Sequence, residues 1–152
     1  MRRTTLAAVL TIVACTSAQA AEADAKKSVL MLSHWQCSTW ASMHDDTASV
    51  ERHFTAGLDA GKVFLDAVVA GTITQEESFQ TVPWIVGLSM QGPSPDFILG
   101  RLFESIQTDA YGRITKTGAD GLPLGPADYI TDDALVSTLS QTQYNRSNCG
   151  LL

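Results

Sequence analysis

The clearest helical period in the chain runs through residues 48–70, ASVERHFTAGLDAGKVFLDAVVA. At 100° per residue, most of its large apolar side chains fall on one face, and Gly71 is placed to end the helix. Asp45-Asp46-Thr47 precedes the segment and offers side chains that can cap its first turn. The apolar face contains Val50, Phe54, Leu58, Phe64, Leu65 and Val68. This pattern predicts an amphipathic core helix.

Gly57 and Gly61 lie inside that apolar face. In a helix interior each glycine costs about 1 kcal/mol relative to alanine, so a compensating interaction is expected. Close approach of another helix onto this small surface would supply it, and so would a ligand bound in a groove. We expect helix packing, with a ligand groove as the alternative.

Two further predicted helices lie near the ends of the chain. Residues 29–43 form the first, and residues 132–144 form the last, which Thr131-Asp132-Asp133 caps. The first helix has Val29, Leu32, Trp40 and Met43 on its inner face, with Leu30 and Cys37 at the edge of that face. The last helix has Leu135, Val136 and Leu139 facing inward.

Cys37 and Cys149 predict a disulfide between these two terminal helices, because Cys149 follows the last helix in a short tail. The bond would close a loop of roughly 110 residues and stabilise the fold by about 4–5 kcal/mol. Neither cysteine belongs to a C-x-x-C pair, so a structural role explains both more simply than a catalytic thiol.

Caps and breakers divide the middle of the chain. Residues 72–77 form a cap followed by an acidic first turn, in which Thr74 and Glu77 have the capping-box spacing. Pro83 either kinks the helix that follows or ends it, in which case a new short helix starts at Trp84.

A second amphipathic core helix is expected over residues 95–111. Ser94 is suited to the N-cap position and Pro95 to the first helical position. Its apolar side carries Leu99, Leu102, Phe103, Ile106 and Ala110. Glycine and proline then accumulate over residues 112–130, which predicts an irregular surface loop with a short extended pair of residues 113–115 and 122–124.

Together these elements predict an all-α fold, a compact bundle of four to five helices with one irregular Gly/Pro-rich loop, closed by the disulfide between the terminal helices. Residues 29–152 would form a single helical domain, and residues 21–28 a tether or frayed start.

The first 20 residues have the organisation of an export signal. A short basic start precedes an apolar run from Leu6 to Ala14, which is far shorter than the roughly 20 residues that span a bilayer. Ala18-Gln19-Ala20 is a complete A-x-A cleavage site, which predicts a periplasmic or secreted protein. The alternative is a lipobox at residues 12–15, in which case acylated Cys15 would anchor the protein to a membrane.

The charge balance of the chain is acidic. Ten basic residues, less Arg2 and Arg3 of the signal, leave eight against sixteen acidic ones, a formal charge of −8. No cluster of Lys and Arg is present that could neutralise phosphates, so we expect no nucleic-acid partner. A basic protein or peptide is the favoured charged partner, unless the charge serves only solubility.

No motif in the sequence predicts a catalytic residue, a metal site or a cofactor. His34, His44 and His53 are too widely spaced for the i, i+4 pairs of helical zinc sites. Residues 87–91 nearly match the G-x-S-x-G elbow around Ser89, but the last position is Gln and all three histidines precede the serine. We therefore expect a protein that is not an enzyme.

Residues 54–61 (FTAGLDAG), a proline-interrupted segment and residues 92–97 (GPSPDF) resemble the Rap1a/Tai immunity family of type VI secretion. This resemblance implies a periplasmic protein that binds and neutralises a toxic effector. Trp35-Gln36-Cys37 is similar to the W-x-C of HdeA-type acid-stress chaperones. That second resemblance implies a chaperone that partly unfolds in acid.

Our leading hypothesis is an exported binding protein of the immunity or inhibitor type that acts on a toxic effector or an enzyme. Long loops often carry function, so the recognition surface is expected in and beside the 112–130 loop. The candidate partner-binding residues are Arg113, Asp120, Asp128 and Tyr129. The alternatives are a periplasmic acid-stress chaperone and an uncharacterised enzyme.

Overall fold

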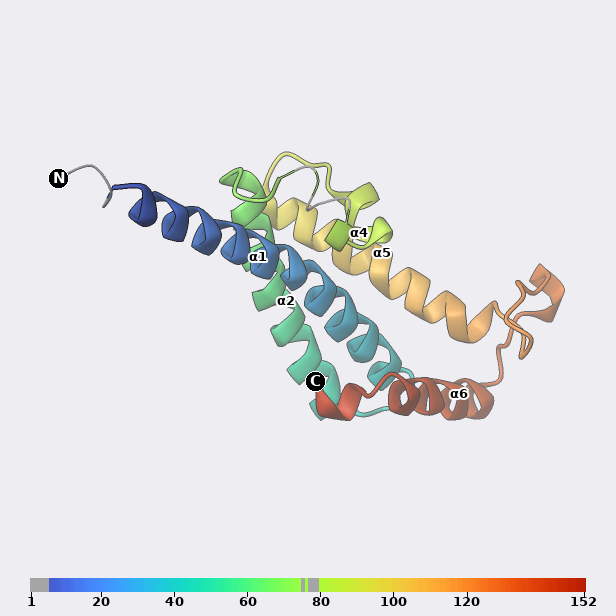
Figure 1. Cartoon of the computed structure of the whole chain (residues 1–152). Helices are drawn as coiled ribbons and strands as arrows, with labels where there is room; N and C mark the ends of the chain where they lie inside the picture. The colour runs from blue at the N-terminus through green and yellow to red at the C-terminus, as the bar shows by residue number, and fades with distance from the viewer. Residues whose placement is uncertain (1–5, 75, 77–79) are drawn as a thin grey trace.

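A computed structural model describes the backbone of residues 6–74, 76 and 80–152, and the side chains within these ranges from residue 19 onward. Figure 1 shows a helical bundle with its C-terminal helix packed across one end. The elements are α1 (Leu6–Ser42), α2 (Thr47–Val69), α4 (Trp84–Ser89), α5 (Pro95–Thr115) and α6 (Asp133–Arg146), with 3₁₀ turns η1 (Pro126–Asp128) and η2 (Cys149–Leu151). The described residues form no strand and a single isolated bridge, which confirms the all-α prediction.

Helices α1 and α2 form a tight hairpin that is the centre of the bundle. The side chain of Asp46 accepts a hydrogen bond from the Ser49 N–H at 3.1 Å and caps α2. A Cβ atom added at Gly57 would lie 2.5 Å from the Trp35 ring, and one at Gly61 would lie 2.8 Å from the Met31 sulfur. The two glycines therefore serve helix packing, as predicted, because α1, and at Gly61 also Leu99 of α5, occupies the space that a side chain would need.

Helix α1 differs from its predicted form. It begins before Val29, and the expected tether, residues 21–28, is helical, with buried side chains at Ala21 and Ala25. Its deepest large side chains are Met31 and Trp35, whereas Val29 is 40% exposed. The predicted inner face was right for Trp40, which is buried, and for Leu32 and Met43, which pack against the core, and it was wrong for Val29.

The core consists of two clusters of buried side chains. The larger one joins the middle of α1 and α2 to α4 and α5, and the smaller one surrounds the disulfide. The larger cluster contains Met31, Trp35, Ala60, Phe64, Leu65, Val86, Leu99, Leu102 and Ile106. The smaller contains Cys37, Trp40, Ala41, Ala110, Ile114, Tyr144 and Cys149. The second cluster anchors α6 to the rest of the fold.

The chain between α2 and α5 follows the second of the two alternatives for Pro83. Pro83 has an extended backbone, with φ −57° and ψ 140°, and α4 begins directly after it at Trp84. The predicted capping box of Thr74 and Glu77 lies in part outside the described residues.

Helix α5 begins as predicted and ends later. The Ser94 hydroxyl accepts a hydrogen bond from the Phe97 N–H at 3.2 Å, and Pro95 is the first helical residue. The helix continues to Thr115 because Ile114 is buried in the smaller cluster. The predicted extended pair was therefore wrong on one side, since residues 113–115 are helical and residues 116–118 pair with 122–124 instead.

Helix α6 is capped by the Asp132 side chain, which accepts a hydrogen bond from the Leu135 N–H at 2.8 Å. The prediction that Leu135 faces inward was wrong, because this side chain is 46% exposed. Val136 and Leu139 pack against the smaller core cluster as predicted, and Ser140 and Tyr144 are buried on the same helix.

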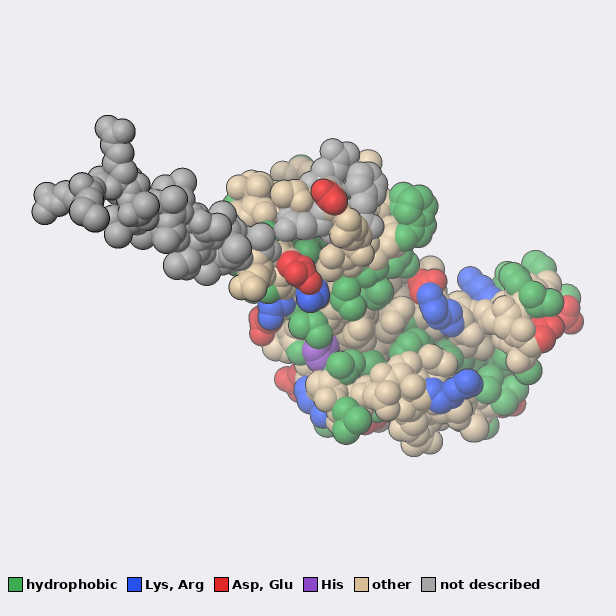
Figure 2. All heavy atoms as spheres, in the orientation of Figure 1, with side chains coloured by type: hydrophobic (Ala, Val, Ile, Leu, Met, Phe, Trp, Pro, Cys, Tyr) green, Lys and Arg blue, Asp and Glu red, His purple; other side chains and the backbone are tan. Residues whose placement is uncertain are grey.

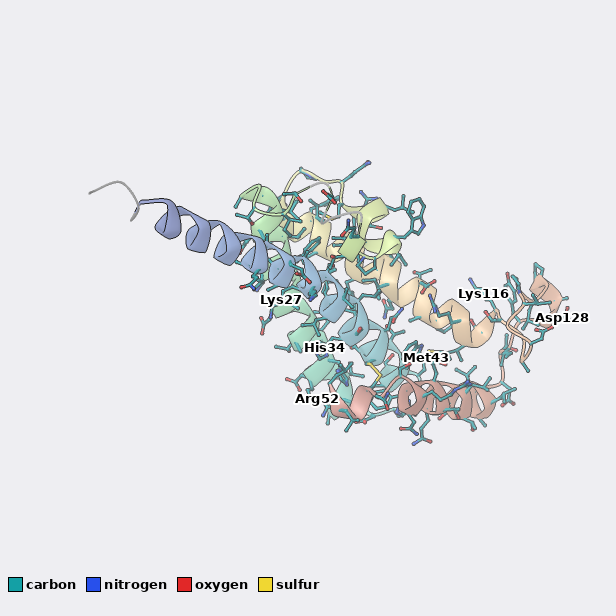
Figure 3. The ribbon with its side chains drawn as sticks, viewed as in Figure 1. Lys27, His34, Met43, Arg52, Lys116 and Asp128 are labelled. Atoms are coloured by element: carbon teal, nitrogen blue, oxygen red, sulfur yellow. A yellow bond between two sulfur atoms is a disulfide. The ribbon has the colours of Figure 1, made fainter. Side chains whose placement is uncertain are left out.

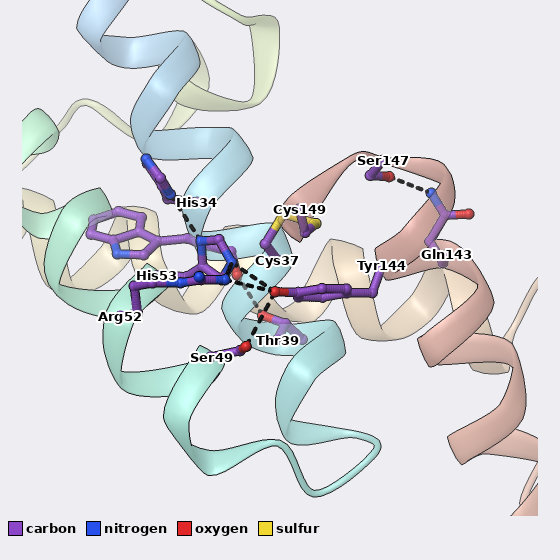
Figure 4. The surroundings of a disulfide bond; sticks show 11 residues. His34, Cys37, Thr39, Ser49, Arg52, His53, Gln143, Tyr144, Ser147 and Cys149 are labelled. Atoms are coloured by element: carbon purple, nitrogen blue, oxygen red, sulfur yellow. Dashed lines mark hydrogen bonds between the residues drawn. A yellow bond between two sulfur atoms is a disulfide. The ribbon is translucent and has the colours of Figure 1, made fainter. Parts of the chain in front are cut away.

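The predicted disulfide is formed. Cys37 of α1 and Cys149 of η2 have Cα atoms 5.7 Å apart, and both side chains are buried (Figure 4). The bond joins the last turns of α1 to the segment that directly follows α6, and the loop that it closes contains α2, α4, α5 and α6.

Candidate functional site

A surface groove lies between the end of α5, the loop that follows it and α6. We call it the α5–α6 groove, and its volume is about 520 Å³. Its lining residues are Arg113, Ile114, Thr117, Gly118, Ala119, Gly121, Ile130, Leu135, Leu139, Thr142, Gln143 and Arg146. Figure 2 shows basic side chains over both α5 and α6 on this side of the molecule. The aliphatic members give the groove an apolar floor between polar edges.

The loop that forms one wall of the groove is held by backbone hydrogen bonds. The N–H groups of Gly118 and Leu124 donate to the carbonyls of Leu122 and Lys116, at 2.8 Å and 2.9 Å. Gly121 turns the chain with a φ of +80°, which glycine adopts most readily. The Ile130 N–H donates to the Thr115 carbonyl at 2.9 Å and ties the end of the loop to α5. The groove is thus preformed.

The four predicted partner-binding residues lie in and around this region, but only Arg113 lines the groove. Asp120 lies between two lining residues, and its carboxylate accepts a hydrogen bond from the Leu122 N–H at 3.0 Å. Asp128 lies in the outer part of the loop, away from the bundle (Figure 3). Tyr129 is 37% exposed, and the Lys116 ammonium lies 5.6 Å from the centre of its ring.

The charged groups in the lining are two arginines. Arg113 pairs with Asp109 one turn before it, with its Nε 2.8 Å from the carboxylate Oδ2. Arg146 lies in the last turn of α6, and within the described part of the chain its side chain makes no ion pair or hydrogen bond. Sequence patterns missed Arg146 because its position beside Arg113 depends on how α6 packs against α5.

A second polar constellation, with His53 and Tyr144 buried, His34 and Ser49 half-buried and Arg52 exposed, lies beside the disulfide where α1, α2 and α6 meet (Figure 4). The imidazole of His53 is fully buried, with its Nδ1 3.0 Å from the Nδ1 of His34. Its Nε2 lies 3.0 Å from the Tyr144 hydroxyl and 3.1 Å from Nη2 of Arg52. Arg52 also donates to the Tyr144 hydroxyl at 3.0 Å, and Ser49 Oγ lies 3.2 Å from that hydroxyl.

These distances determine the protonation state of His53. Arg52 can only donate hydrogen bonds, so the Nε2 atom next to it must accept and carries no proton. The proton of the neutral ring is therefore on Nδ1 and is donated to Nδ1 of His34. Burial, and then the positive charges of Arg52 and His34, lower the pKa of His53 to about 4. Burial and Arg52 also lower the pKa of His34.

The sequence spacing of the histidines gave no sign of this pair. His34 and His53 are 19 residues apart, and they meet because α1 and α2 form a hairpin. Ser89, at the near match to a nucleophile elbow, lies in α4 with its hydroxyl 3.5 Å from that of Ser105. In the described part of the chain no hydrogen bond joins Ser89 to a histidine, so the geometry gives the hydrolase alternative no support.

No helix within the described ranges combines the length and the apolar character needed to cross a membrane. The disulfide indicates an oxidising compartment and hence export from the cytoplasm. Comparison with protein-family models, curated proteins and solved structures found no match to this chain.

Proposed function

We propose that this chain is an exported binding protein of the immunity or inhibitor type, and not an enzyme, that recognises a protein partner through the α5–α6 groove. The observation that carries the proposal is a preformed groove with an apolar floor beside a hydrogen-bonded loop. Next to the groove the loop exposes Leu122, which is 64% accessible, and Tyr129. Exposed apolar side chains around a concave surface are typical of interaction sites.

The proposed export route is cleavage of the signal after Ala20, which would release a periplasmic or secreted protein. The burial pattern supports this site, because Gln19 and Ala20 are exposed whereas Ala21 is buried. Cleavage there would leave the buried side chains of Ala21 and Ala25 in the mature chain. The alternative is a lipoprotein anchored through Cys15.

The residues that carry the resemblance to the Rap1a/Tai family have identifiable roles in this fold. Gly57 and Gly61 allow α1 to pack on α2, and Ser94 and Pro95 start α5. These are roles in folding, so a shared pattern of this kind favours a shared architecture. The immunity function itself rests on the groove.

Affinity capture from the periplasm of the source bacterium tests the proposed function. The signal-processed chain with its disulfide intact would serve as bait, and the captured protein would be purified and assayed for its own activity with and without the bait. We expect one stoichiometric partner whose toxic or enzymatic activity falls when the chain is added. Absence of such a partner, or a partner with unchanged activity, would contradict the proposal.

Buried His53 and its contact with half-buried His34 favour a second candidate function, an acid-stress chaperone. Protonation of His53 would remove the acceptor of the Arg52 hydrogen bond and place a second positive charge beside that guanidinium. The contacts of Tyr144 with α2 would then weaken, and α6 would loosen while the disulfide keeps it attached.

Acid exposure of the purified chain, mixed with a test enzyme that aggregates at low pH, examines this candidate. A chaperone would lose helix-to-helix packing and suppress aggregation of the enzyme in the same pH range. Retention of the folded structure without any protection of the enzyme would dismiss the chaperone function.

A further inference from the structure

The charge of the α5–α6 groove is opposite to that of the whole chain. The chain has sixteen acidic residues against ten basic ones, yet the groove is lined by two arginines and by no aspartate or glutamate among the described residues. An excess of acidic residues had suggested a basic partner. The lining of the groove is instead complementary to an acidic partner.

Both arginines have donors to spare. Arg113 uses its Nε for Asp109, and its side chain remains 61% exposed. Arg146 is exposed and makes no side-chain ion pair or hydrogen bond in the part of the chain that the structure describes. A position in the last turn of a helix suits a cation, which explains why Arg146 is tolerated there. The helix dipole can account for an arginine at the end of each helix, but it does not account for two arginines from different helices that line the same groove.

The floor between the arginines is aliphatic. Ile114 is almost completely buried beneath it, Ile130 and Leu139 are half-buried, and Leu135 is 46% exposed. Thr117, Thr142 and Gln143 add polar side chains to the lining. A bound segment would need an apolar side chain for the floor, and a carboxylate for at least one guanidinium, which arginine binds in a bidentate manner.

We propose that the α5–α6 groove binds an acidic segment of a partner protein, with an aliphatic or aromatic side chain on the Leu135–Leu139 floor and a carboxylate at Arg146, Arg113 or both. This inference rests on the proposed function and specifies the chemistry of the partner. The net acidic charge of the chain would disfavour acidic proteins over the surface as a whole, and the two arginines of the groove would offer local attraction.

Selection from a random peptide library tests the inference without knowledge of the partner. The disulfide-bonded chain would be immobilised, and bound peptides would be sequenced and resynthesised. We expect enrichment of peptides in which Asp or Glu lies near Leu, Ile or Phe. For these peptides Arg146→Glu should weaken binding by about tenfold or more.

Lys62→Glu provides the matched control, because Lys62 is an exposed cation of α2 that lies outside the groove and the substitution changes charge by the same amount. The inference predicts that Lys62→Glu leaves peptide affinity within about twofold, which is the range expected for remote surface charges. Equal weakening by both variants would show a general charge effect and overturn the inference. Circular dichroism of each variant would verify that it is folded.

Other outcomes separate this inference from the proposed function. If the selected peptides compete for the groove but lack acidic residues, the inference of an acidic partner segment is wrong, while the proposal that the groove binds a protein still holds. Concentration-dependent dimers in light scattering that Arg146→Glu abolishes would show that a second copy occupies the groove, and would overturn the inference in favour of self-association.

Discussion

His53 remains neutral because of its surroundings on three helices. The ring lies in α2, and it faces His34 of α1, Tyr144 of α6 and the Arg52 guanidinium, with Asp46 as the acidic group that acts on it. Burial is the largest cause of its low pKa. The unfolded chain binds a proton at this position near pH 6.5, whereas the folded chain does so only at about pH 4.

The free energy of unfolding should therefore depend on pH through His53. A folded pKa below the unfolded value means that this contribution is fully present above pH 6.5 and is lost as pH falls toward 4. Between pH 7.5 and 5, the wild type should lose about 2 kcal/mol more than His53→Phe, as measured by urea unfolding at each pH.

Tyr144→Phe is the control for that comparison. It removes the hydroxyl that contacts His53, Arg52 and Ser49. Stability at pH 7.5 should fall by about 1–2 kcal/mol while most of the pH dependence persists, because the histidine is still present. Identical pH dependence in the wild type and His53→Phe would show that His53 is not responsible.

Gly57 provides a second prediction about one residue. Alanine would gain about 1 kcal/mol of helix propensity there, but its Cβ would lie 2.5 Å from the Trp35 ring. That ring is almost fully buried, and its Nε1 donates to the Phe54 carbonyl at 3.2 Å, so it has little freedom to move. Gly57→Ala should therefore lower the free energy of unfolding by about 1–3 kcal/mol in denaturant titrations, the usual cost of overpacking.

Gly100→Ala in α5 is the matched control, because nothing lies within 4 Å of the Cβ position there. It should raise stability by about 0.5–1 kcal/mol through helix propensity alone. A stabilising effect at both glycines would mean that α1 does not pack against α2 in the manner described.

Element boundaries followed from the sequence wherever a cap specifies them. Asp46, Ser94 and Asp132 each accept a hydrogen bond from the backbone of the first helical turn, and the three helices begin where these side chains predict. Helix ends were less predictable. Helix α5 continues to Thr115 because Ile114 is buried in the smaller core cluster, a tertiary contact that the local sequence does not indicate. The inner faces of α1 and α6 were predicted only in part, because α1 is contacted on several sides and α6 buries Ser140 and Tyr144 in place of Leu135.

The disulfide should dominate the attachment of the terminal elements. It joins residues 112 positions apart, so it restricts the unfolded chain strongly. Cys37→Ala combined with Cys149→Ala should lower the free energy of unfolding by about 4–5 kcal/mol, as measured by urea titration without reductant.

Reductant provides the control for the cysteine variant. It should bring the wild type close to the stability of the double variant and leave the double variant unchanged. A double variant that is as stable as the oxidised wild type would show that helix packing alone holds α6 in place.

The whole molecule combines an acidic net charge with a groove that is lined by two arginines. The 112–130 loop and Arg113, which composition and position pointed to, lie at this groove. The sequence did not predict Arg146 or the outward-facing Leu135, because both join the groove only through the packing of α6 beside α5. The periodicity of a segment describes that segment alone, so it cannot predict that two distant segments meet, as His34 and His53 do.

The affinity of the purified partner for groove variants tests most directly whether this groove binds a protein. Leu135→Asp places a charge on the floor, and Val63→Asp makes the same kind of change on an equally exposed residue of α2, since the two side chains are 46% and 43% exposed. We expect calorimetric titration to show a dissociation constant that is raised by about tenfold or more for Leu135→Asp and little changed for Val63→Asp. Unchanged affinity for Leu135→Asp would contradict the claim that the groove is the binding site.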